Sequence, residues 1–242
     1  RSSDLITIWK WLMSGTKRPR IAILGRFAES TSVTRYAGVV NARRLLELIW
    51  AAGGEPLTLL PVAGSNWDER LAGFDGVLMP GGSDVNPKTY GEEPNTDELY
   101  GIDDLQDEVD LSLVKYVFEK GLPLLTVCRG TQITNVALGG KLLQHMEQPH
   151  RHHVAAVTFE ANQAELGISN ITAQASCYHH QIIKELGAGV TPIAHAAEGH
   201  VEAVRYENAK NWAFGLQWHP EDNFDEDAVE LEITKAFINA CR

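Results

Sequence analysis

The stretch Gly121-Leu122-Pro123-Leu124-Leu125-Thr126-Val127-Cys128-Arg129-Gly130 places a lone cysteine between an apolar run and a helical pattern. Residues 124–127 are typical of a buried strand, and residues 130–138 are typical of a helix. In α/β enzymes such a strand-to-helix turn carries a nucleophile, and the helix N-terminus favours a thiolate there. We interpret Cys128 as a candidate nucleophile, against the alternative that it is a small buried side chain.

A second segment offers a base for that nucleophile. In Trp218-His219-Pro220-Glu221 an imidazole is followed two residues later by a carboxylate. Side chains two apart on an extended segment share a face, so Glu221 can orient the His219 ring. Taken alone the motif is typical of a surface turn; combined with Cys128 it predicts a catalytic base and its orienting group.

A third segment offers an anion-binding loop. Pro80-Gly81-Gly82-Ser83-Asp84 follows the apolar run 76–79, and glycines leave backbone N–H groups free to face an oxyanion. We predict that the N–H groups of Gly82 and Arg129 form an oxyanion hole. A nucleophile, a base with its orienter and an anion hole together indicate acyl transfer.

These motifs resemble the class I glutamine amidotransferase superfamily of cysteine hydrolases (peptidase C26 type), and within it the γ-glutamyl-γ-aminobutyrate (GABA) hydrolase-like branch. The resemblance runs from about Arg20 to the C-terminus. The superfamily features are the Cys-x-Gly turn and the His-Pro-Glu segment. The branch features are the segments 80–90, 128–132 with Asn135 and 138–140, and Tyr178-His179-His180-Gln181. Thr126 departs from the superfamily, which usually has glycine there, and Cys177 departs from the branch, which has serine.

The resemblance implies a Cys128, His219 and Glu221 triad that cleaves the γ-glutamyl amide bond of γ-glutamylated amines or amino acids. The reaction would pass through a thioester and release glutamate, with a role in polyamine and putrescine catabolism. One alternative is a glutaminase subunit that supplies ammonia to a separate synthetase. Another is a catalytically silent binding or regulatory member. The chemistry requires no cofactor.

Four further residues are candidates for substrate binding. Alternation along an extended stretch would turn His179 and Gln181 toward the pocket and His180 away from it. Gln132, one turn into the helix after Cys128, and Tyr90, in the branch-like segment, are expected to contact the substrate. The alternatives are surface histidines and solvated polar side chains.

Four histidines, His145, His150, His152 and His153, raise the question of a metal. No carboxylate or cysteine stands at ligand spacing beside them, so we interpret the segment as a polar loop and predict no metal site.

Composition limits the other functions. The net charge of −11 would repel a polyanion, so we expect no nucleic-acid partner, and no apolar run reaches the length of a membrane span. Three widely spaced cysteines without a CxxC pair favour a reduced cytoplasmic compartment. The expected partner is a small γ-glutamyl amide substrate. The oligomeric state stays open, with a homodimer among the alternatives.

The chain alternates apolar β-like runs with amphipathic helices, which indicates an α/β fold with a mainly parallel sheet between helices. We expect strands at 21–24, 57–60, 76–79, 124–127, 154–159, 190–194, 201–206 and 213–218, and helices at 36–52, 103–120, 130–138 and 226–240. The extended segments of the second half predict an antiparallel extension of the sheet. With the resemblance, this is a flavodoxin-like three-layer sandwich. We predict one domain over 20–242, preceded by an extension over 1–19 whose role is open.

Overall fold

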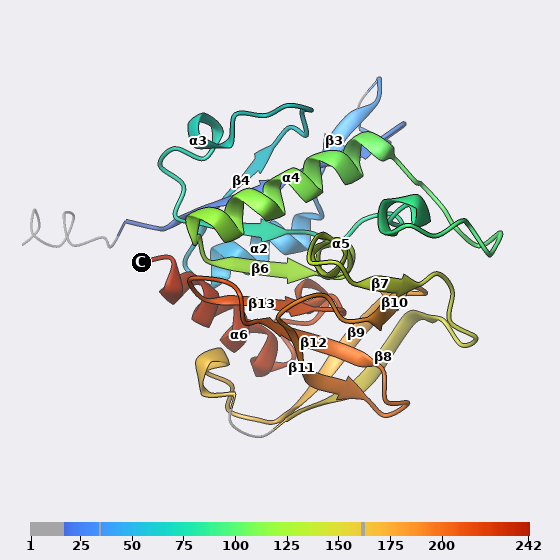
Figure 1. Ribbon diagram of the computed structural model, residues 1–242. Helices are drawn as coiled ribbons and strands as arrows, with labels where there is room; N and C mark the ends of the chain where they lie inside the picture. Colours follow the sequence, from blue (N-terminus) through green and yellow to red (C-terminus); the bar gives the residue numbers. More distant parts are fainter. Residues whose placement is uncertain (1–16, 34, 161–162) are drawn as a thin grey trace, which may run out of the picture.

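A nine-stranded sheet forms the centre of the protein, in a computed structural model that describes residues 17–33, 35–160 and 163–242 (Figure 1). The strand order is β4-β1-β5-β6-β13-β12-β11-β8-β9. The first five strands run parallel: β4 (Glu55–Leu59), β1 (Arg20–Leu24), β5 (Gly76–Met79), β6 (Leu124–Val127) and β13 (Ala213–Leu216). The other four continue antiparallel: β12 (Val201–Tyr206), β11 (Val190–Ala196), β8 (His150–Phe159) and β9 (Thr172–His179). The expected parallel sheet and its antiparallel extension are therefore confirmed.

Helices cover the two faces of the parallel part. The α-helices of the described residues are α2 (Arg43–Ala51), α3 (Trp67–Arg70), α4 (Asp104–Lys120), α5 (Arg129–Ala137) and α6 (Ala228–Ala240). Alternate residues of β1 enter two separate cores: Ile21 and Ile23 pack with residues of α2 and α6, whereas Ala22 and Leu24 pack with residues of α4 and α5. The structure is thus the expected three-layer sandwich.

The local signals at α4 explain its bounds. The Asp103 side chain accepts a hydrogen bond from the Gln106 N–H and caps the first turn. Gly121 ends the helix in the left-handed conformation, at φ 76°. Both ends of α4 could be predicted from the sequence, because a capping residue determines a helix end through contacts with the adjacent turn.

The helix expected over 36–52 begins later, at Arg43. Residues Gly38–Val40 instead form β3, which pairs with β2 (Arg26–Ala28) in a small antiparallel sheet. The β-branched Val39 and Val40 fit a strand better than a helix. Pairing with β2 therefore decides their conformation, although the spacing of the apolar residues indicated a helix.

Several elements were not expected. β9 pairs with β8 along its whole length, and β7 (Lys141–Leu143) pairs with β10 (Ile182–Glu185) in a second small sheet. The described ranges also contain the 3₁₀ turns η1 (Pro87–Tyr90), η2 (Ala164–Leu166) and η3 (Pro220–Asp222).

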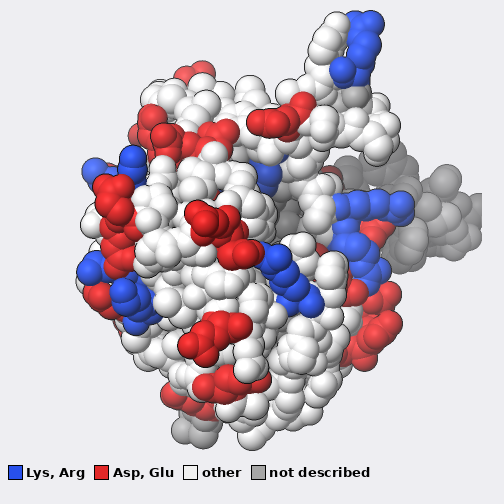
Figure 2. Space-filling model, turned by 90° about the vertical axis from the view of Figure 1, so that its right-hand side faces the viewer, with Lys and Arg blue, Asp and Glu red and all other residues white. Residues whose placement is uncertain are grey.

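Within the described part of the chain, no helix combines the length and apolar character needed to cross a bilayer. On the face drawn in Figure 2, basic and acidic side chains lie interspersed. Most of the expected N-terminal extension, residues 1–16, falls outside the described residues.

Candidate active site

Cys128 lies on a sharp turn between β6 and α5. It is the N-cap residue of α5, with φ 49° and ψ −111°, a conformation that non-glycine residues rarely adopt. Its carbonyl accepts from the Thr131 and Gln132 N–H groups, while its own N–H donates to Leu216 of β13 at 2.7 Å. The helix start therefore fixes the sulfur at the carboxyl end of β6, as the sequence predicts for a nucleophile elbow.

Glycine is required two residues after Cys128, at position 130. A Cβ on Gly130 would lie 2.2 Å from the Met79 carbonyl oxygen of β5. The absence of that atom lets α5 pack against β5 and brings the start of the helix close to the sheet.

Thr126 does not disturb this turn. Its hydroxyl is fully buried and forms hydrogen bonds with Thr131 at 2.9 Å and Tyr206 at 2.8 Å. Gly215 on the neighbouring β13 provides space for this side chain, because a Cβ at position 215 would lie 2.5 Å from the Thr126 hydroxyl. A side chain at position 126 is thus accommodated within the sheet.

His219 contacts both proposed partners. Its Nδ1 lies 2.9 Å from Glu221 Oε1, and Glu221 is 3% exposed. Burial alone would lower the pKa of His219, but the hydrogen bonds and charges of Cys128 and Glu221 outweigh it and raise the pKa well above the ordinary value. The structure therefore brings Cys128, His219 and Glu221 together in one chain of contacts.

Neighbouring elements hold this chain in place. Arg44 of α2 donates to the Glu221 carbonyl at 3.0 Å and fixes the η3 turn. The Trp218 indole N–H donates to the buried Glu230 carboxylate of α6 at 2.9 Å. The His219 N–H donates to Ser176 of β9 at 2.8 Å. The segment from Trp218 to Glu221, which carries the imidazole, is thus held by α2, α6 and β9.

The Pro80-Gly81-Gly82 turn lies against the same residues. A Cβ on Gly81 would lie 2.8 Å from His219 Cε1 and 3.7 Å from Cys128 Cβ. A Cβ on Gly82 would lie 3.0 Å from Arg129 Cδ. Gly82 and Arg129, expected to form the oxyanion hole, are therefore neighbours, and the Arg129 N–H belongs to the first turn of α5, where backbone donors lack helical partners.

A buried ionic network holds this turn. Arg26 donates to the carbonyls of Gly81 at 2.8 Å and Pro80 at 2.6 Å, and pairs with Asp110 at 2.9 Å. The Arg129 side chain, 2% exposed, pairs with Asp110 and Asp107. The charges of two guanidinium groups and two carboxylates thus balance one another beside the candidate site.

A cavity of about 430 Å³ opens in front of His219. Its lining includes Arg26, Gly81, Gly82, Tyr178, His219 and Glu221. Cys128 does not itself line the cavity; it lies next to Gly81 and is 5% exposed. A small substrate in this cavity would reach the imidazole and the glycine turn together.

Buried amide side chains lie next to the cysteine. Gln217 donates to Cys128 Sγ at 3.7 Å, and Gln132 donates to Gln217 Oε1 at 3.3 Å and to the Gln181 carbonyl at 2.9 Å. Gln132 and Gln181 thus belong to the wall near the nucleophile. Sequence reasoning missed Gln217, although its place one residue before Trp218 at the end of β13 could have indicated it.

Two expected substrate residues lie elsewhere. The His179 side chain turns away from the cavity, with Nε2 3.5 Å from Glu202 Oε1, and Tyr178 lines the cavity instead. Burial alternates along β9, and His179 falls on its buried face, so the expectation for His179 was wrong. Tyr90 packs in the apolar core with residues of α4 and α5 rather than in the cavity.

Residues 19–221 match the peptidase C26 family. The chain belongs to that family. It is 34% identical to a putative glutamine amidotransferase-like protein, YvdE, of Lactococcus lactis over 77% of this chain and 83% of the relative. It is 31% identical to the γ-glutamyl-γ-aminobutyrate hydrolase PuuD of Escherichia coli K12, over 82% of this chain and 85% of the relative.

A solved structure has the same fold. A glutamine amidotransferase from Thermotoga maritima superposes with a TM-score of 0.60 at 14% identity, over 84% of this chain and 76% of that one. The peptidase C26 chain thus has the class I glutamine amidotransferase fold. Its family and its relatives support a hydrolase that acts on amide bonds.

Proposed function

We propose that this peptidase C26 protein is a cysteine hydrolase that cleaves γ-glutamyl amides of the γ-glutamyl-GABA type. The observation that carries the proposal is the contact of His219 with both Cys128 and Glu221 at the edge of the cavity. A nucleophile, a base and an orienting carboxylate are the groups that acyl transfer needs. The similarity to PuuD supports the γ-glutamyl substrate class.

The first half-reaction forms a thioester. The Cys128 thiolate attacks the γ-carbonyl carbon, and the N–H groups of Gly82 and Arg129 bind the resulting oxyanion. The tetrahedral intermediate then collapses, the C–N bond breaks, and His219 gives its proton to the departing amine. The raised pKa of His219 suits this step, because the ring must be protonated before the amine leaves.

The second half-reaction restores the enzyme. Neutral His219 takes a proton from water, the hydroxide attacks the thioester carbon, and the C–S bond breaks to release glutamate and the Cys128 thiolate. Glu221 holds the ring tautomer throughout and stabilises the imidazolium form. One connected set of side chains thus serves both half-reactions.

A turnover screen tests the proposal. Glutamate release is measured with γ-glutamyl-GABA, γ-glutamyl-putrescine, other γ-glutamyl amides and free glutamine. We expect release from γ-glutamyl amides in preference to glutamine. Preference for free glutamine would instead support the glutaminase alternative, and absence of turnover by the folded protein would support the catalytically silent one.

The matched variant is Cys128→Ala. It removes one sulfur atom from a buried turn, so we expect an unchanged circular dichroism spectrum and no glutamate release. Turnover at the wild-type rate in this variant would refute the assignment of the nucleophile.

A further inference from the structure

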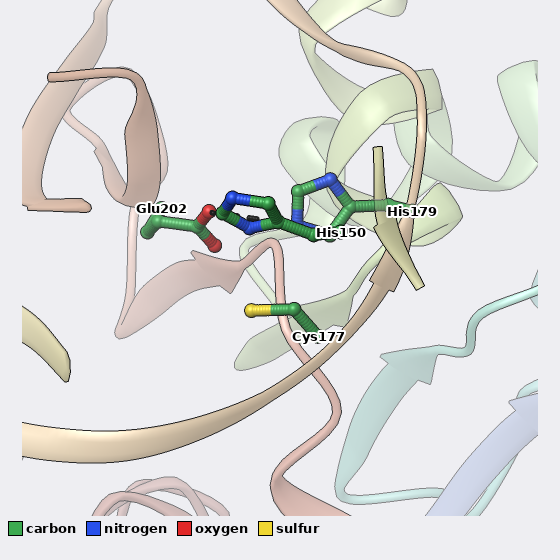
Figure 3. A group of neighbouring side chains, drawn as sticks. All are labelled: His150, Cys177, His179 and Glu202. Carbon is green, nitrogen blue, oxygen red and sulfur yellow. Dashed lines mark ion pairs between the residues drawn. The ribbon is translucent and has the colours of Figure 1, made fainter. Parts of the chain in front are cut away.

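A second group of reactive side chains adjoins the candidate active site, and one member, Cys177, also lines its cavity. His150, Cys177, His179 and Glu202 come together from β8, β9 and β12, and one ligand atom from each lies within 4.8 Å of all the others. Figure 3 shows the two imidazole rings and the carboxylate close together, with the cysteine sulfur on one side of them. Their exposed fractions run from 0% to 6%.

Glu202 forms ion pairs with the imidazoles around it, but the polar atoms of this group lack well-formed hydrogen bonds. Among the described residues, His150 Nδ1, both ring nitrogens of His179 and both oxygens of Glu202 lack a hydrogen bond of proper geometry. A buried carboxylate and buried imidazoles without hydrogen bonds are costly, and a bound cation is a common way to compensate them. These missing hydrogen bonds therefore point to a ligand that binds between the four side chains.

The donor set selects the cation. A thiolate, two imidazoles and a carboxylate are the ligands of zinc, whereas magnesium and calcium prefer oxygen ligands alone. In a tetrahedral zinc site neighbouring donor atoms lie roughly 3.3–3.8 Å apart. Glu202 Oε1 lies 3.5 Å from His179 Nε2 and 3.9 Å from His150 Nδ1, close to that range.

We propose that His150, Cys177, His179 and Glu202 form a closed structural zinc site. His200 Nε2, 3.1 Å from Glu202 Oε1, stands beside the carboxylate and would orient it as an outer partner. Four protein ligands leave no open position for substrate, which is typical of a structural rather than a catalytic zinc.

The site lies next to the candidate active site through β9. The Tyr178 carbonyl, between the ligands Cys177 and His179, is 4.0 Å from Cys128 Sγ, and the Ser176 carbonyl accepts from the His219 N–H. A zinc ion that ties β9 to β12 would hold this strand against the catalytic residues.

Sequence reasoning interpreted the histidine segment as a polar loop without a metal. Only His150 of that segment enters the group, and its partners lie 27, 29 and 52 residues further along the chain, at 177, 179 and 202. His150 stands directly opposite His179 in the β8–β9 pair, a relationship that depends on strand register.

Zinc binding is tested in a Cys128→Ala background, so that the thiol of the candidate active site cannot contribute. The whole chain is dialysed first against Zn²⁺ and then against metal-free buffer, and zinc is measured by mass spectrometry. We expect about one zinc ion per chain, and a loss of affinity of at least about 100-fold on Cys177→Ser or Glu202→Gln. The control His195→Gln, on β11 with its imidazole 4.0 Å from Glu160, should keep the full content.

Cobalt gives a second readout. Co²⁺ bound by a thiolate shows a charge-transfer absorption, which we expect in the background protein and in His195→Gln but not in Cys177→Ser. Cys177→Ser changes a single atom, so circular dichroism should show that it folds even if Glu202→Gln does not. Failure of the background protein to retain zinc, or retention unchanged by Cys177→Ser, would overturn the proposal.

Discussion

The Nδ1 atom of His219 lies 2.9 Å from Glu221 Oε1, across the turn that leaves β13. This contact engages Nδ1 with the carboxylate and therefore leaves the other ring nitrogen, Nε2, for Cys128. Pro220 stiffens the two-residue connection, and Arg44 holds its backbone from α2. The orientation of the imidazole is therefore built into a short turn and does not depend on a mobile loop.

Replacing Glu221 by Gln should lower kcat/KM by about 10²–10⁴-fold, because an amide keeps a polar partner but loses the charge that stabilises imidazolium. The same change should lower the pKa of His219, since Glu221 is one of the groups that raise it. The alkaline limb of the pH–rate profile should accordingly move to lower pH. Steady-state kinetics between pH 5 and 10 measure both effects.

Glu226→Gln is the control for this variant, because Glu226 is an exposed carboxylate only five residues away. It should leave both the rate and the profile unchanged. An unshifted profile in Glu221→Gln would show that Glu221 does not act on the imidazole.

Gly81→Ala should reduce turnover while preserving the fold. The new Cβ would lie 2.8 Å from His219 Cε1, so the ring must move away from its present position beside Cys128. A displacement of about 1 Å at a reacting group can cost about 100-fold in rate. We expect a fall in kcat of at least about 10-fold with an unchanged melting temperature, and an unchanged rate in the neighbouring Ser83→Ala.

Gly130→Ala tests packing rather than chemistry. The added Cβ would lie 2.2 Å from the Met79 carbonyl oxygen, and backbone cannot rotate away as a side chain can. Overpacking of this kind costs about 1–3 kcal/mol or more of the free energy of unfolding. Urea denaturation measures the loss, with Ala137→Gly at the exposed end of α5 as a control that should cost only about 1 kcal/mol. A stability equal to wild type would contradict the close approach of α5 to β5.

The elements that sequence reasoning predicted share a local cause. β5, β6 and α4 carry their own signals: an apolar run, a capping aspartate, and a glycine where φ must be positive. The elbow was equally readable, because Cys128 follows an apolar run and precedes Gly130. In each case the deciding residues lie within one element or directly beside it.

What could not be predicted depends on contacts distant in sequence. Alternation along β9 gives a period of two, but only the packing of β9 in the sheet decides that His179 is buried beside Glu202. Tyr90 stands in a motif-like segment, yet its side chain fills the apolar core with residues of α4 and α5. The buried cluster of His150, Cys177 and Glu202 needs three strands and their register.

The buried Glu230 carboxylate predicts a specific pH dependence of stability. Burial, only partly offset by the hydrogen bond from Trp218, raises its pKa from 4.5 to about 8. Because the folded state holds this proton more tightly than the unfolded state, the stabilising contribution is complete below about pH 4.5 and is lost as the pH rises through 8. Each unit of pKa difference corresponds to about 1.4 kcal/mol.

Glu230→Gln keeps an oxygen for the Trp218 indole but cannot ionise, so its free energy of unfolding should fall less than that of wild type between pH 5 and 9. Urea midpoints at several pH values give the comparison, and the exposed Glu119→Gln should follow wild type. Parallel curves for wild type and Glu230→Gln would show that the Glu230 carboxylate is already ionised in the folded protein at pH 5, which its burial beneath Trp218 makes unfavourable.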